Sequence, residues 1–512
     1  MCGIIAIVSR PPQRPAPEPA SLLEGLDRAL ALVGDPAAVA EAAAEVDAAL
    51  RGLPGVLALA DRHELVASIE VRLDQLGAYS EAVEAALADD VAGLDADALE
   101  RANGASIRLR DVLWAIRRDR LRTAREVDAL AGRDASVSAR GGYLAIQQAL
   151  SAIDRMEVRG RDSAGLHVFV WDGRLDLAPR QVPEFVNELR DRSGDRLFQA
   201  RSVRSVDGPA GSVLSFVYKA AAEIGELGDN TAALRSQIVG DDLLRRALSF
   251  PWAEVSVLGH TRWASVGIIS EPNAHPVNSD ELELAGQGLG GAQKTELAGP
   301  YVVGVLNGDV DNHADLQSTH GLRIAGQITT DAKVIPTLVS RNAQVTGDDR
   351  DGIIEAFRRA VASFDGSVAI GAATSARPEL MLLALRGSGQ GIYIGIAEDR
   401  YVVASEPYGI VEETDRFVRL DGEHGGQLVA LDAFQAGTLE GIHRFGYDGS
   451  PWPVTDTDVA VAEVTTRDID RGDAPHFLLK EICESPNSLA KTLRGKVVDD
   501  GGRLRSVVGG RA

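Results

Sequence analysis

A cysteine stands at position 2, and the residues that follow it, from Gly3 to Val8, are almost all apolar. Four of them are isoleucine or valine, a composition that favours a β-strand buried on both faces. The proline-rich run 11–19 ends this strand, because proline cannot donate the backbone hydrogen bonds of a sheet. Residues 1–9 are therefore expected to form a buried strand with a thiol at its start.

Cys2 has two interpretations. If Met1 is removed, as is usual ahead of a small residue, Cys2 carries both a thiol and a free α-amino group. Their reference pKa values, about 8.5 for the thiol and about 7.7–8.0 for the amine, let the amine take up the thiol proton near neutral pH. Nucleophiles of this kind are a recognised variant of triad chemistry. In the other interpretation Cys2 only opens the strand, and its position alone does not decide between the two.

Composition limits the class of protein. A length of 512 residues allows two to four domains, at roughly 100–200 residues each. Two cysteines, Cys2 and Cys483, cannot form a disulfide framework, which suits a reducing cytoplasm. The net charge of −22 argues against nucleic acid or an anionic membrane as a partner. No run approaches the roughly 20 apolar residues of a membrane span. We therefore expect a cytoplasmic protein.

No cofactor is expected. The nine histidines include no metal-binding motif such as His-Glu-x-x-His, so no metal site is predicted either. The run 286–291 matches the Gly-x-Gly-x-x-Gly template of dinucleotide-binding proteins. It lacks the strand-turn-helix surroundings that such a site needs, and it is therefore interpreted as a glycine-rich turn.

The chain alternates between two kinds of composition. Residues 20–135 are rich in alanine, leucine and charge at helical spacing, and they predict a helical insertion that serves either as an accessory bundle or as a partner-docking module. From Tyr143 the pattern becomes mixed, with a helix that ends near Glu157 and a series of short apolar runs. A second helix-rich stretch, 180–250, interrupts this series. Layered sheets are predicted from the strand-like runs 166–171, 254–258, 301–306, 367–371, 380–385, 391–396 and 401–404.

Four short segments carry the polar residues that could do chemistry. Each alone has an ordinary interpretation, because Asn-Gly is a common turn signal and an isolated Arg-Trp is usually a surface contact between a cation and a ring. Their order along the chain is more informative. The segments are Arg159–Gly165, Gly259–Ser265 followed by Asn273–Pro276, Leu306–Asn312, and Thr329–Ile335.

Taken in order, Cys2, Gly-His-Thr-Arg-Trp, Asn-Ala-His-Pro, Asn-Gly and Thr-Asp resemble the class II glutamine amidotransferase domain of the glutamine–fructose-6-phosphate aminotransferase family. The resemblance covers residues 1–9 and roughly 143–495, with both helix-rich blocks as insertions. The segment Phe477–Asn487 resembles the family's connector from the glutaminase domain to the sugar-isomerase domains; an amphipathic surface helix is its other interpretation.

The resemblance implies an α+β fold, the four-layer αββα sandwich of N-terminal-nucleophile hydrolases with helical insertions. The amidotransferase domain would span 1–9 and 140–475, interrupted by the insertions 20–135 and 180–250. Residues 476–512 would form a connector toward sugar-isomerase domains, which these few residues cannot contain. The resemblance also allows a homodimer.

The implied reaction is attack of Cys2 on the side-chain amide of L-glutamine, which gives a γ-glutamyl thioester and ammonia. The oxyanion hole would be the side-chain amide of Asn307 and the backbone N–H of Gly308. Asparagine supplies N–H donors without adding charge, and glycine lets the backbone approach closely.

Four further residues are implied to bind the substrate. Arg262 would bind the glutamine carboxylate, which a guanidinium fork suits, and Asp331 would bind the α-ammonium group. Trp263 and Ser265 would belong to a loop that closes over glutamine. Val266 departs from the family, which usually has histidine there, and this places loop closure in question. The segment 159–165 is expected to support the nucleophile strand, and His260 and His275 are interpreted as structural hydrogen-bonding residues.

The sequence therefore predicts the glutaminase part of an aminotransferase that makes glucosamine 6-phosphate, with fructose 6-phosphate bound by isomerase domains outside this chain. Two alternatives stay open. One is a stand-alone glutaminase, or an amidotransferase for another acceptor. The other is a catalytically inactive amidotransferase-like binding module.

Overall fold

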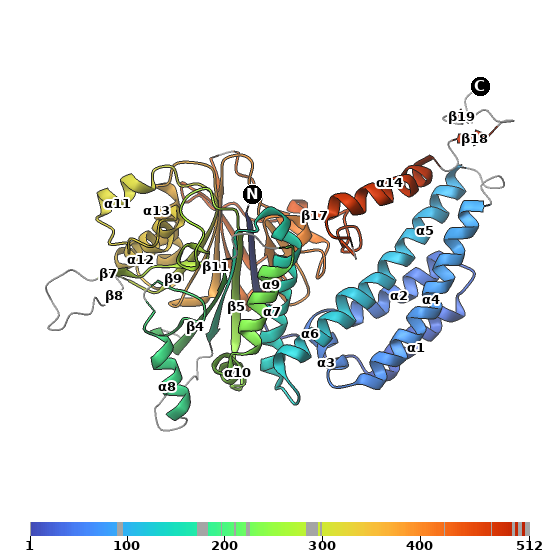
Figure 1. Ribbon diagram of the computed structural model, residues 1–512, viewed down its shortest axis with the longest axis horizontal. Helices are drawn as coiled ribbons and strands as arrows, with labels where there is room; N and C mark the ends of the chain where they lie inside the picture. The colour runs from blue at the N-terminus through green and yellow to red at the C-terminus, as the bar shows by residue number, and fades with distance from the viewer. Residues whose placement is uncertain are drawn as a thin grey trace. The chain divides into compact units, whose positions relative to one another are not determined.

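The computed structural model divides the chain into two compact units, each described here by itself (Figure 1). Unit 1 comprises residues 1–13 and 126–464, and unit 2 comprises residues 14–125 and 465–512. Met1 and the glycine-rich run 286–291 lie outside the described residues. The structure describes residues 2–89, 96–171, 183–195, 197–208, 211–221, 226–282, 295–296, 299–423, 425–472, 474–493, 497–499 and 504–506.

Unit 1 is built on two sheets whose strands pair in an antiparallel manner. The nine-stranded sheet has the order β17-β14-β12-β13-β1-β5-β2-β4-β3, so β1 lies in its middle. The six-stranded sheet has the order β16-β15-β11-β10-β9-β6. The first sheet contains β1 (Gly3–Ser9), β2 (Ser163–Trp171), β3 (Val203–Gly208), β4 (Gly211–Ala220), β5 (Glu254–Arg262), β12 (Tyr393–Ile396), β13 (Arg400–Ala404), β14 (Arg416–Arg419) and β17 (Val459–Val461); the second contains β6 (Val277–Asn278), β9 (Val302–Gly308), β10 (Val368–Thr374), β11 (Arg377–Arg386), β15 (Gln427–Asp432) and β16 (Ile442–Gly446).

The two sheets pack face to face on a shared apolar core. Ile4, Ala6 and Val8 of β1 belong to one buried cluster with Val303 and Val305 of β9. Ile5 and Ile7 are also fully buried, and alternation along a strand directs them to the opposite face. Strand β1 is thus buried on both faces, as its composition predicts.

Helices cover the outer face of each sheet (Figure 1). α7 (Val137–Met156) packs on β1 and β5, and its N-cap is Ser136, whose hydroxyl accepts from Ala139 N–H at 3.1 Å. The face predicted from its spacing, which includes Tyr143 and Ile146, is fully buried. α12 (Val334–Thr346) and α13 (Arg350–Ala362) cover the six-stranded sheet. The layers therefore confirm the predicted αββα sandwich.

The second helix-rich stretch contributes to the sandwich itself. Its helices are α8 (Pro183–Arg192), α9 (Asp229–Val239) and α10 (Asp242–Leu248). Between α8 and α9 the chain forms β3 and β4, two strands that the sequence pattern did not predict. β4 pairs with β2, and β3 is the edge strand beyond β4. The nine-stranded sheet therefore owes two of its strands to this stretch.

Unit 2 is helical and has a core of its own. Asp47 of α2 and Arg120 form an ion pair at 2.8 Å, and both side chains are at most 5% exposed. α14 leaves Leu478, Ile482 and Leu489 exposed. In the described parts of the chain, no helix combines the length and apolarity that a membrane crossing requires. The helices are α1 (Pro19–Ala31), α2 (Pro36–Ala49), α3 (Gly52–Leu59), α4 (His63–Asp89), α5 (Ala96–Trp114), the π-helix η1 (Ala115–Leu121) and α14 (Phe477–Leu493), while α6 (Arg122–Ala131) continues into unit 1.

Candidate active site

The polar segments of the sequence meet at one end of the sandwich because of strand direction. β1 begins directly after Cys2 and runs antiparallel to β5, so Gly3 lies opposite Thr261. The start of β1 therefore meets the end of β5, where Arg262 lies. β9 of the other sheet contacts both strands and ends at Gly308. Segments more than 250 residues apart in sequence are thus brought to the same place.

The Cys2 thiol is held by the backbone of Trp263. Its Sγ accepts a hydrogen bond from Trp263 N–H at 3.2 Å, and Trp263 O lies 3.4 Å from the same sulfur. Burial raises the pKa of the Cys2 thiol, while the Trp263 N–H and the positive charge of Arg262 act in the opposite direction. Within the described residues, the hydrogen bonds of this sulfur are made with the Trp263 backbone.

Asn307 contacts Cys2 through an amide whose orientation is set by His260. Asn307 Nδ2 donates to the Cys2 carbonyl at 2.9 Å. His260 Nε2 lies 2.9 Å from Leu306 O and 3.0 Å from Asn307 Oδ1. A carbonyl only accepts, so Nε2 carries the proton and Oδ1 is the Asn307 atom that faces it. Burial lowers the pKa of His260 to about 3, so the ring stays neutral and keeps the Asn307 N–H groups turned toward Cys2.

Gly308 occupies a position that no other residue could take without movement. Its φ is +88°, in the region that favours glycine. A Cβ here would lie 2.0 Å from Ser367 O. The backbone of Gly308 therefore passes close to that of Ser367, and its role as an oxyanion donor stays a prediction.

Arg262 holds the loop that follows it. The guanidinium is almost fully buried, and its Nη1 donates to Ile268 O at 3.3 Å. Its Nη2 donates to Val266 O. This contact uses the backbone of Val266, so the departure from histidine at this position does not remove it. Within the described residues, two of the five guanidinium N–H groups donate to these carbonyls.

Two further residues of this loop, Ser265 and Gly267, make close contacts with neighbouring segments. Ser265 Oγ donates to Asp309 Oδ1 at 2.6 Å, next to the end of β9. Gly267 has a φ of +87°, and a Cβ there would lie 2.9 Å from Thr329 Oγ1. Trp263 as a whole is 59% exposed. The loop is therefore fixed at its backbone while its aromatic side chain faces solvent.

Asp331 is oriented by a chain of hydrogen bonds. Its Oδ2 accepts from Val310 N–H at 2.8 Å, and burial raises the pKa of its carboxyl. His275 Nδ1 accepts from Leu306 N–H at 3.4 Å, so its Nε2 carries the proton that points to Thr330 Oγ1 at 3.0 Å. Thr330 Oγ1 in turn lies 3.5 Å from Asp331 Oδ1. Asp331 also lies close enough to Arg262 for their charges to interact.

The segment 159–165 lies one strand away from where it was expected. β2 pairs with β5 and β4, and β5 separates it from β1. Asp162 Oδ2 accepts from Ala264 N–H at 2.8 Å, and a Cβ on Gly160 would lie 2.8 Å from the Arg262 carbonyl carbon. The prediction that this segment supports the nucleophile strand is therefore corrected: it supports the end of β5 and the loop that holds the Cys2 thiol.

Sequence reasoning gave no role of their own to three supporting residues, Asp162, Asp309 and Thr330, although all three lie within segments that it singled out. Each lies beside a residue that was singled out, but each acts on a partner distant in sequence, such as Ala264 for Asp162. The only available signal was that the carboxylates lie within the segments 159–165 and 306–312. Within the described ranges, no group of three or more His, Cys, Asp or Glu side chains could hold a metal ion.

A cysteine placed directly before the central strand of an αββα sandwich defines the fold of the N-terminal-nucleophile hydrolases. No family model matches the chain. Similar curated proteins are glutamine–fructose-6-phosphate aminotransferases (isomerizing). The one from Lactococcus lactis is 27% identical over 275 residues, which cover 54% of this chain and 40% of that protein. The one from Geobacillus kaustophilus is 29% identical over 249 residues, 48% of this chain and 35% of that protein.

The enzyme of this name from Pseudomonas aeruginosa is 26% identical over 354 residues, 68% of this chain and 42% of that protein. The chain thus spans less than half the length of these relatives. Among solved structures, the Bacillus subtilis glutamine phosphoribosylpyrophosphate amidotransferase bound to ADP and GMP shares 17% identity. It covers 59% of this chain and 47% of its own, with a TM-score of 0.34. The fold assignment therefore rests on the sheets described above.

Proposed function

We propose that the chain is a glutamine amidotransferase that hydrolyses L-glutamine with Cys2 as the nucleophile. The observation that carries the proposal is the meeting of Cys2, Asn307 and the Trp263 backbone at one end of the sandwich. Arg262, whose charge interacts with both Cys2 and Asp331, lies at the same place. This supplies a nucleophile, an amide donor and one charge of each sign.

The active form carries Cys2 as its first residue, so that its α-amino group is the base. The amine takes the thiol proton, and the thiolate attacks the side-chain amide carbon of glutamine. A C–S bond forms while the C=O electron pair moves to oxygen. Asn307 Nδ2 and Gly308 N–H donate to this oxyanion. The oxyanion then collapses, the C–N bond breaks, and the nitrogen leaves as ammonia with the proton from the α-ammonium group.

The second half of the reaction repeats this geometry with water. The amine takes a proton from water, whose oxygen attacks the thioester carbon, and the same donors stabilise the second oxyanion. The C–S bond breaks, the sulfur regains its proton, and glutamate leaves. The loop 263–268 covers the site during this sequence and excludes bulk water.

Recognition of glutamine rests on its two backbone charges. Arg262 binds the α-carboxylate through its guanidinium N–H groups. Asp331 binds the α-ammonium group, and the bonds from Val310 and Thr330 keep its carboxylate in place. We further propose fructose 6-phosphate as the ammonia acceptor, because the similar aminotransferases are named for it. The acceptor site would lie in isomerase domains outside this chain.

The test uses 6-diazo-5-oxo-L-norleucine, an electrophilic glutamine analogue, with intact mass and peptide mapping as readouts. We expect a protein without Met1 and a single adduct on Cys2. Cys483 is an internal control, since it is exposed on α14 and reacts with a simple alkylating reagent but not with the glutamine analogue. Ammonia release from glutamine should disappear in Cys2→Ala and fall by roughly 100- to 1000-fold in Asn307→Ala, the usual loss for one oxyanion donor.

A folded protein that leaves Cys2 unmodified while Cys483 reacts with iodoacetamide would overturn the proposal and favour a binding module. A different result would refute only the proposed acceptor, fructose 6-phosphate. In that result Cys2 carries the adduct, and ammonia release is stimulated by other candidate acceptor proteins but not by isomerase domains that bind fructose 6-phosphate.

A further inference from the structure

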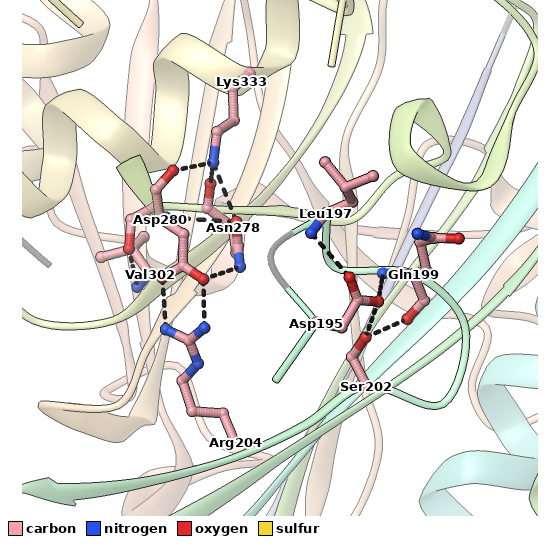
Figure 2. Close-up of polar contacts among 10 residues, drawn as sticks. Asp195, Leu197, Gln199, Ser202, Arg204, Asn278, Asp280, Val302 and Lys333 are labelled. Carbon is pink, nitrogen blue, oxygen red and sulfur yellow. Dashed lines mark hydrogen bonds and ion pairs between the residues drawn. The ribbon is translucent and has the colours of Figure 1, made fainter. Parts of the chain in front are cut away.

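A buried lysine lies two residues after Asp331, on the same turn of chain. This turn is η4 (Asp331–Lys333), and its two charged side chains have different partners. Asp331 accepts from Val310 N–H, whereas Lys333 is 1% exposed and points toward Asn278 and Asp280 (Figure 2). Lys333 Nζ donates to Asp280 O at 2.8 Å, to Asn278 Oδ1 at 3.0 Å and to Asn278 O. The ammonium group thus ties η4 to the segment after β6.

Arg204 reaches the same segment from the other side. Both of its terminal nitrogens donate to the two Asp280 carboxylate oxygens, and Figure 2 shows this fork opposite Lys333. The Asp280 side chain is 1% exposed. Arg204 belongs to β3, and the loop before β3 is held by Asp195, which accepts from Gln199 N–H at 2.7 Å and Ser202 Oγ at 2.6 Å. The second helix-rich stretch therefore contacts the segment that anchors η4.

Charge balance links Arg204 to the position of η4. A buried carboxylate without a partner is strongly destabilising. When Arg204 is removed, an ion pair between Asp280 and another cation is therefore favoured. Lys333 is the cation available, since its charge already interacts with that of Asp280. A shift of Lys333 toward the carboxylate breaks its bonds to the two backbone carbonyls and moves η4. Displacement of the Asp331 carboxylate weakens its charge-assisted hydrogen bond to the α-ammonium group, and the expected loss of affinity is about tenfold.

We infer that Arg204 and Lys333 are positioning residues that hold Asp331 for recognition of an α-amino group, so that β3 of the second helix-rich stretch sets the affinity for glutamine. The inference rests on the proposed glutaminase function. Cys2 and Asn307 are held by separate contacts, to Trp263 and His260. Loss of Arg204 therefore weakens substrate binding more than it slows the chemical step.

The experiment compares Arg204→Gln with a matched control, Arg192→Gln, in the full chain. Arg192 of α8 also makes a forked pair with a buried carboxylate, at 2.8 and 2.6 Å to Asp241, and is similarly exposed at 13% against 19% for Arg204. Ammonia release is measured with L-glutamine and with 4-carbamoylbutanoate, which lacks the α-amino group. We expect Arg204→Gln to raise KM for glutamine about tenfold with little change in kcat, and to leave kcat/KM for 4-carbamoylbutanoate as in the wild type.

Arg204→Lys, which keeps the charge without the fork, should restore part of the affinity. Lys333→Met should raise KM further, and if it does not fold, the Arg204 variants decide. With an active wild type, two results would refute the inference. One is an equal loss of kcat/KM for glutamine and for 4-carbamoylbutanoate in Arg204→Gln; the other is a KM for glutamine that is the same in Arg204→Gln and Arg192→Gln. A wild type that releases no ammonia from glutamine refutes the proposed function and the inference together.

Discussion

Two stretches of this chain have similar helix-rich sequences but different structural roles. Residues 14–125 form unit 2 together with 465–512, and their helices pack on one another. The second stretch, within 180–250, belongs to unit 1 and supplies β3 and β4 to the nine-stranded sheet. Helical content therefore did not distinguish an independent unit from a part of the sandwich. The difference lies in where the apolar strand residues find partners: Phe216 and Val217 of β4 are fully buried in unit 1.

The two stretches also differ in where the partners of their buried charged side chains lie. In unit 2 the Asp47 carboxylate is compensated within the unit by Arg120 and by Arg51, at 2.9 Å. In the second stretch, Arg204 and Lys219 reach residues around the candidate active site. Lys219 of β4 is fully buried and donates to Glu271 O at 3.1 Å. Two buried cations of the second stretch therefore contact residues around the site, whereas the buried Asp47 of unit 2 is compensated within that unit.

Deleting each of the two helix-rich stretches should give the largest difference between them, in whether unit 1 still folds. Replacing residues 14–125 by a short Gly-Ser linker and ending the chain at Val464 should leave unit 1 folded, because all strands of the nine-stranded and six-stranded sheets lie within it. Replacing 203–220 by a similar linker should abolish folding, because β2 loses its partner β4. Circular dichroism, solubility and ammonia release measure both outcomes. A folded, active protein without 203–220, or an unfolded unit 1 without unit 2, would break the comparison.

A buried lysine should make the stability of unit 1 depend on pH. Burial lowers the pKa of Lys219 to about 7, against about 10.4 for an unfolded lysine. Unfolding between these values takes up a proton, so the free energy of unfolding rises with pH, by about 1.4 kcal/mol per unit for this group. Lys219→Met should remove that part of the slope between pH 7.5 and 9.5.

Urea denaturation at several pH values measures this slope, with the wild type as reference. Lys333, whose pKa burial lowers to about 8, adds to the slope in both proteins and cancels in their difference. Lys480→Met, in α14 of unit 2, serves as a control for the loss of a lysine outside unit 1. Identical slopes for wild type and Lys219→Met would show that Lys219 stays charged in the folded protein.

Removal of two helix caps should give the smallest changes in stability, and each change should be confined to the unit that contains the cap. Asp35 caps α2 of unit 2 by accepting from Ala37 N–H at 3.1 Å, and Ser136 caps α7 of unit 1. Alanine at either position should cost about 1 kcal/mol. Hydrogen exchange should show the loss in unit 2 alone for Asp35→Ala and in unit 1 alone for Ser136→Ala, with Asp35→Asn as a cap-preserving control. Loss of protection in both units from either variant would mean that they unfold together.

Local sequence pattern predicted the inner strands of both sheets, whereas the outer strands β3, β4, β6, β14, β15, β16 and β17 were missed. The apolar run after Cys2 is β1, the face with Tyr143 and Ile146 is buried in α7, and each expected strand from 166–171 to 401–404 overlaps an observed strand. The strands β3 and β4 were missed because they lie between helices, in a stretch whose average composition is helical. Strand pairing with β2 overrides that local preference, since β-structure depends on neighbours distant in sequence.

What the sequence determined by itself was local: which runs form strands and helices, and which segments carry a thiol, amides and charges. Periodicity and residue chemistry suffice for this, because neighbouring residues set them. Only the tertiary structure decided that His260 orients Asn307, that Asp162 supports the loop after β5, and that Arg204 faces Asp280. These contacts join distant segments through hydrogen bonds whose strength depends on direction and burial, and no local pattern records either.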